Sequence, residues 1–130
     1  MDIDVKSLPT PSGNNLAIPS RNGILAIKNF IGNDKVFEVG SMSGMWGFLL
    51  REEGVDVQSI ESLNRLNTRN VLLISWSVNT STKYFRGKKI IYIGNASDVL
   101  SLNSNWKLVH NVCISELFRT NDYAKMYIRD

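Results

Sequence analysis

The sequence predicts an α/β domain with a doubly wound, mostly parallel sheet and an antiparallel pair of strands at its C-terminal edge. Short runs that are apolar on both faces alternate with helix-like stretches through most of the chain, a pattern typical of a sheet covered by helices on two sides. The first such strand enters a helix through a turn bounded by glycines, and the last two strands alternate apolar and polar residues. Right-handed crossovers favour the doubly wound topology.

Length and composition fit one domain. The chain has 130 residues, of which 43% are hydrophobic and 21% are charged, values that are typical of globular proteins. One cysteine and one histidine exclude an internal disulfide and a Cys/His zinc site, so we expect no metal. The formal net charge of +3 permits an anionic ligand or nucleic acid without indicating either. We expect a cytoplasmic protein away from membranes, because no apolar run approaches the ~18 residues of a membrane span. Association of identical copies is left open.

The N-terminal part divides into an arm and the start of the domain. Residues 1–15 are rich in proline, serine and asparagine, so we expect a flexible arm followed by a single domain at 16–130. A helix over 20–31 is predicted from its apolar stripe, with Ser20 as its cap and Gly32 as its stop.

The remaining elements follow from apolar runs bounded by turn residues. A second helix is predicted at 45–53, a short helix at 79–86, and a short helix or a loop at 96–103. The expected strands are 35–39, 55–60, 71–76, 89–93, 106–114 and 123–128.

The turn after the first strand is the best candidate for a ligand site. Gly40 and Gly44 allow a tight turn and a close approach of the backbone, and the helix that follows offers free amides to a carboxylate or phosphate. Glu61 ends the next strand, where an acid about 20 residues downstream accepts hydrogen bonds from ribose hydroxyls. From the pattern alone, an ordinary strand-to-helix turn with a solvated acid fits equally well.

Two other chemistries fit this turn poorly. A nucleophile elbow needs a serine midway between its glycines, but Met42 stands there. A phosphate-binding P-loop needs a Gly-Lys-Ser/Thr sequence that does not follow.

Five segments, in order along most of the chain, resemble the class I S-adenosylmethionine-dependent methyltransferases. They are AIPS at 17–20, VFEVGSMSGMW at 36–46, EGVDV at 53–57 with the acid at 61, LLISW at 72–76 and YFRGKKIIYIG at 84–94. The resemblance implies a Rossmann-like domain of the methyltransferase type and S-adenosylmethionine as the cofactor.

The resemblance also implies roles for individual residues. The cofactor-binding set is Glu38, Gly40, Ser41, Met42, Gly44 and Glu61. In it the backbone of Gly40 and Ser41 faces the methionine part of the cofactor, and Glu38 supports their loop. Gly44 lets the helix pack closely, and Glu61 holds the ribose hydroxyls.

The substrate side is less defined. The resemblance places Ser75 and Trp76 at the substrate mouth, but it identifies neither a catalytic residue nor the methyl acceptor. Three departures from the family pattern matter: Met42 replaces a loop glycine, Ser77 and Val78 replace a proline pair, and the segment between 61 and 71 is short. They favour an alternative, a catalytically inactive methyltransferase-like binding or regulatory module.

A small basic cluster precedes the fourth predicted strand and consists of Lys83, Arg86, Lys88 and Lys89. It fits a phosphate-bearing acceptor, including nucleic acid, and it equally fits a solvated end of an element.

Overall fold

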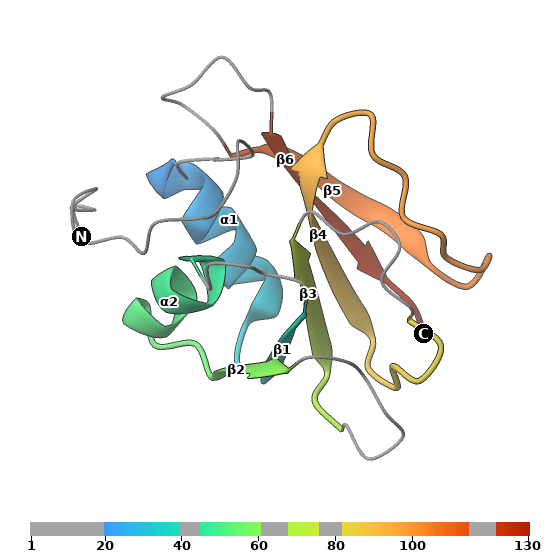
Figure 1. Ribbon diagram of the computed structural model, residues 1–130, viewed down its shortest axis with the longest axis horizontal. Coiled ribbons are helices and arrows are strands. Elements are labelled where there is room, and N and C mark those ends of the chain that lie inside the picture. The colour runs from blue at the N-terminus through green and yellow to red at the C-terminus, as the bar shows by residue number, and fades with distance from the viewer. Residues whose placement is uncertain (1–19, 40–44, 61–67, 76–81, 115–121) are drawn as a thin grey trace.

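The computed structural model describes residues 20–39, 45–60, 68–75, 82–114 and 122–130 (Figure 1). Within these residues the chain forms two helices and six strands. In chain order they are α1 (Arg21–Ile31), β1 (Val36–Val39), α2 (Met45–Glu52), β2 (Val57–Ile60), β3 (Val71–Ser75), β4 (Lys89–Asn95), β5 (Lys107–Cys113) and β6 (Asp122–Ile128).

The six strands form one sheet in the order β2-β1-β3-β4-β6-β5. β1 pairs in parallel with β2 and β3, β3 pairs in parallel with β4, and β6 runs antiparallel to both β4 and β5. The predicted mostly parallel sheet with an antiparallel C-terminal edge pair is therefore confirmed. The last strand inserts between β4 and β5, so β5 forms the edge.

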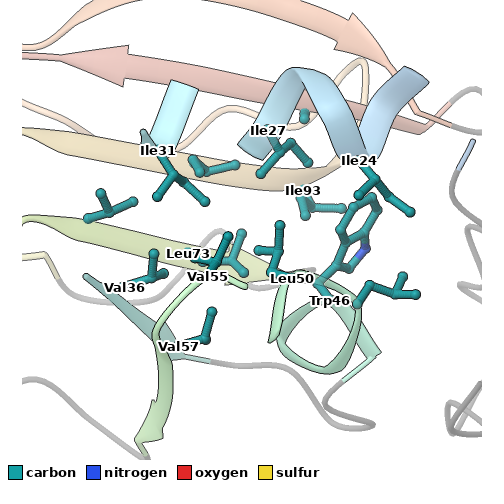
Figure 2. Packing of buried hydrophobic residues seen from close by; sticks show 14 of the residues in the cluster. Ile24, Ile27, Ile31, Val36, Trp46, Leu50, Val55, Val57, Leu73 and Ile93 are labelled. Atoms are coloured by element: carbon teal, nitrogen blue, oxygen red, sulfur yellow. The ribbon is translucent and has the colours of Figure 1, made fainter. Parts of the chain in front are cut away.

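Both helices lie on one face of this sheet, where they build the larger core (Figure 1). Ser20 begins α1, and its hydroxyl accepts a hydrogen bond of 2.9 Å from the backbone N–H of Gly23, which confirms it as the cap. Figure 2 shows Ile24 and Ile27 of α1 on the same side of the sheet as Trp46 and Leu50 of α2. Burial of these side chains, all at most 3% exposed, fixes α2 against the sheet.

The second face is covered differently, and the doubly wound arrangement is not confirmed. Among the described residues, this face packs against side chains from the segments that lead into and out of β4, including Phe85 and Leu100. Trp106, just before β5, is partly buried against the same cluster. Both described helices lie on the first face.

The short helix expected at 79–86 does not form where the structure describes it, since residues 82–86 are turn and coil. Of the two alternatives at 96–103, the structure shows turn and coil. Carbonyl groups of both segments accept hydrogen bonds from distant cations. The Arg129 guanidinium donates to the carbonyl of Phe85, and the Lys125 ammonium donates to the carbonyls of Ala96 and Asp98. Carbonyls held this way are directed to distant cations instead of to the amides of a helix. The prediction at 79–81 lies outside the described residues.

Candidate functional site

The strand order changes direction beside β1, which defines the place where such sheets bind ligands. After β1 the chain adds β2 on one side and then returns to add β3 on the other. In open α/β sheets, ligands bind beyond the carboxyl ends of the strands at this switch point. Here those ends are Val39 of β1 and Ser75 of β3, and α2 begins close by in sequence at Met45.

Most of the predicted site residues lie outside the described residues. They are Gly40, Ser41, Met42, Gly44, Glu61 and Trp76. Their predicted roles stay predictions. Glu38 and Ser75 are described, and both belong to strand ends at the switch point.

Glu38 is the central residue of the described part of the site. Its side chain is 1% exposed and points to the helix-covered face. One carboxylate oxygen, Oε2, accepts a hydrogen bond of 2.8 Å from the backbone N–H of Gly47 in α2. The other, Oε1, accepts a hydrogen bond of 2.8 Å from the hydroxyl of Ser59 in β2. One buried acid therefore joins β1, α2 and β2.

Glu38 also places a negative charge at the N-terminal turn of α2. The first turn of this helix contains no acidic residue, and its first amides lack partners within the helix. Because the helix dipole places partial positive charge there, the carboxylate of Glu38 is favourably positioned at Gly47. A charged acceptor makes this hydrogen bond stronger than a neutral one.

Gly47 and Ser59 are functional positions that sequence reasoning missed. A Cβ atom at position 47 would overlap Oε1 of Glu38, so the acid reaches the helix only because residue 47 is glycine. The available signal was a glycine inside the short apolar helix MWGFLLRE, since glycine there is unfavourable without a packing reason. Ser59 carried no signal of its own.

Two buried polar groups, one at the end of β3 and one in α2, have no hydrogen-bond partner within the described part of the chain. The Ser75 hydroxyl and the indole N–H of Trp46 have no hydrogen-bond partner among the described residues, although Ser75 is only 2% exposed and Trp46 only 1%. Most buried polar groups are paired, so such a group commonly serves a ligand or a bound water. Ser75 at the carboxyl end of β3 thus agrees with a site that holds a polar molecule.

Two charged pairs lie at the other end of the sheet, where the parallel strands begin. A hydrogen bond from Lys89 holds the pKa of Asp34 below its usual value, and their atoms lie 2.9 Å apart. A hydrogen bond from Arg69 likewise lowers the pKa of Asp56. These residues stand before or at the start of strands, so the pairs tie strand beginnings together and lie away from the switch point.

Two further observations concern other classes of site. Within the described ranges, no group of three or more His, Cys, Asp or Glu side chains could hold a metal ion. Neither α1 nor α2 is long and apolar enough to cross a membrane.

Comparison with solved structures places the chain in a class by its fold. Over most of its length the fold of this chain is similar to that of a protein assigned as a methyltransferase. Comparisons with protein-family models and with curated proteins found no match.

The particular structures are distant from this chain. The Escherichia coli protein yhhF, assigned as a methyltransferase, is similar over 95% of this chain and 99% of its own, with a TM-score of 0.52 and 9% sequence identity. The 16S rRNA methylase RmtB is similar over 82% of this chain and 61% of its own, with a TM-score of 0.46 and 6% identity. At these identities the likeness to yhhF shows a methyltransferase-like fold alone. The TM-score to RmtB is too low to show a shared fold.

Proposed function

We propose that the chain is an S-adenosylmethionine-dependent methyltransferase. The observation that carries the proposal is the buried carboxylate of Glu38, which binds Gly47 of α2 and Ser59 of β2. These contacts hold α2 and β2 beside the end of β1, from which the chain continues into residues 40–44. That loop is the part of the chain that the sequence assigns to the cofactor.

The residues have separate tasks in this proposal. The main chain of Gly40 and Ser41, with Met42 and Gly44 next in sequence, receives the methionine part of the cofactor, and Glu61, which follows β2 in sequence, accepts its ribose hydroxyls. Each oxygen of Glu38 already accepts a hydrogen bond within the protein, so we assign Glu38 a supporting role. It is a positioning residue that holds the loop.

Ser75 and Trp76 border the acceptor. The Ser75 hydroxyl, buried and without a partner among the described residues, is available to bind a polar atom at the end of β3. S-adenosylmethionine supplies an activated methyl group when bound, so the chain mainly has to align donor and acceptor. A base is required only where the acceptor must lose a proton first.

Isothermal titration of the full chain with S-adenosylhomocysteine tests the proposal. We expect saturable binding and expect Gly40→Val to weaken it at least about tenfold, equivalent to ~1.4 kcal/mol, because a side chain closes the approach to the loop backbone. Ala96→Val is the matched control, since it adds bulk to an exposed turn after β4 and should bind normally. Absence of heat at millimolar ligand, or equal affinity of Gly40→Val and wild type, contradicts the proposal.

The alternative is a catalytically inactive methyltransferase-like module, which Met42 and the Ser77-Val78 replacement favour. Cofactor binding is not required of the module, so turnover separates it from the enzyme. Transfer of a labelled methyl group from S-adenosylmethionine to any component of a cell extract supports the enzyme. Binding without transfer supports the module.

A further inference from the structure

A basic cavity lies at the end of the sheet where the parallel strands begin, opposite the carboxyl ends of β1 and β3. It has a volume of about 500 Å³ and is lined by Arg86, Lys88, Asn105, Arg129 and Asp130. These residues precede β4 and β5 or follow β6, so the cavity opens where the parallel strands begin. Figure 1 shows the C-terminal end of β6 beside the segment that leads into β4. β3 runs from this end of the sheet to the switch point, and its five residues span about 13 Å.

Arg129 forms a rigid wall of this cavity. Its Nε donates to the carbonyl of Gly87 at 2.9 Å, and its Nη2 donates to the carbonyl of Phe85 at 2.7 Å. Its guanidinium carbon lies 4.4 Å from the centre of the Trp106 ring, a favourable cation–π contact. A guanidinium has five N–H groups, so three remain for a ligand in a fixed orientation.

The other cations of the cavity are exposed and not used by the fold. Among the described residues, the side chains of Arg86 and Lys88 make no hydrogen bond or ion pair, and Asp130 is the one acidic side chain in the lining. Lys89, the next residue, points elsewhere: its ammonium donates to the carbonyl of Phe30 and pairs with Asp34. Of the basic cluster of the sequence, Lys89 is therefore structural, whereas Arg86 and Lys88 line the cavity.

We propose that this cavity binds the phosphate group of an anionic ligand, either a free phosphate compound or the backbone of a nucleic acid. Three cations against one carboxylate leave an excess of positive charge, and the Asn105 side chain adds a neutral donor. The fixed fork of an arginine matches phosphate oxygens in geometry and charge. The volume exceeds what a single phosphate occupies, so the group can carry a substituent. This inference does not depend on methyl transfer.

The test measures two probes on the full chain at low salt without cofactor. Inorganic pyrophosphate is titrated by calorimetry, and a fluorescein-labelled ten-nucleotide single strand is titrated by anisotropy. The variant is Arg86→Glu/Lys88→Glu, which reverses two exposed charges and spares Arg129, since loss of Arg129 would also disturb the fold. We expect it to weaken binding of the occupied probe at least about tenfold, with a smaller salt dependence, because phosphate contacts dominate such binding.

A matched control separates the site from net charge. Arg21→Glu/Lys35→Glu changes the formal charge by the same four units at exposed positions outside the cavity, and it should weaken binding less than about threefold. If both probes bind the wild type and both lose affinity in the cavity variant, the ligand is a nucleic acid. If pyrophosphate alone binds, the ligand is a free phosphate compound. The proposal is overturned if neither probe binds the wild type, if the cavity variant binds normally, or if the control loses as much.

Discussion

Replacement of Gly47 by alanine should destabilise the fold even though alanine is the better helix former. The new Cβ would overlap Oε1 of Glu38, so the carboxylate has to move away from Gly47 N–H and the Ser59 hydroxyl. A hydrogen bond to a charged group contributes about 1.5–3 kcal/mol, and glycine-to-alanine in a helix contributes at most ~1 kcal/mol in the other direction. Loss of one to two such bonds, less the helix-propensity gain, therefore lowers the free energy of unfolding by about 0.5–5 kcal/mol.

The same substitution in a Glu38→Ala background gives the opposite sign. Without the carboxylate the overlap is gone, and Gly47→Ala should be neutral or stabilise by up to ~1 kcal/mol. Urea unfolding followed by tryptophan fluorescence measures the four proteins of this double-mutant cycle, which isolates the coupling between positions 38 and 47. Ser59→Ala is the milder control, since it removes one of the two hydrogen bonds. An equal effect of Gly47→Ala in both backgrounds refutes the assigned role of Glu38.

Three further predictions concern stability. Ser75→Ala should raise the free energy of unfolding of the ligand-free chain by about 0.5–1 kcal/mol in a urea titration, because it removes a buried hydroxyl without a described partner; a loss above ~1 kcal/mol contradicts this. The hydrogen bond from Lys89 lowers the pKa of Asp34, so their pairing stabilises the fold above pH 3.8, and this stabilisation is lost as pH falls through the folded pKa. Asp34→Asn should therefore make the free energy of unfolding depend less on pH in acid. An unchanged dependence would count against the pairing. Burial, with a hydrogen bond to Asp98, raises the pKa of Tyr92 above its usual 10.0, so its contribution is present below pH 10.0 and lost as pH rises through the folded pKa. Tyr92→Phe should therefore reduce the loss of stability in alkali, and an equally steep loss would exclude it.

The sequence predicted the elements whose signals are local. The helix predicted at 20–31 is observed at Arg21–Ile31, and the strand predicted at 71–76 is observed at Val71–Ser75. Both are bounded by turn residues and carry apolar patterns of the right period, so neighbouring residues alone decide them.

The parts that depend on distant contacts were not predicted. The cations that donate to the carbonyls of residues 85, 87, 96 and 98 lie in β6 or just after it, far along the chain, so no local window of sequence contains these contacts. The position of β6 between β4 and β5 is likewise a choice among sheet orders that strand patterns do not distinguish. In the site, Glu38 was predicted as a support, but its partners Gly47 and Ser59 became visible only in three dimensions.

A crystal structure of the full chain grown with S-adenosylhomocysteine tests the central claim most directly. The account predicts the ligand at the carboxyl end of β1, with its methionine part against residues 40–44 and its ribose hydroxyls on Glu61. A ligand bound in the Arg129 cavity, or a Met42 side chain filling the space beside the loop, would contradict it.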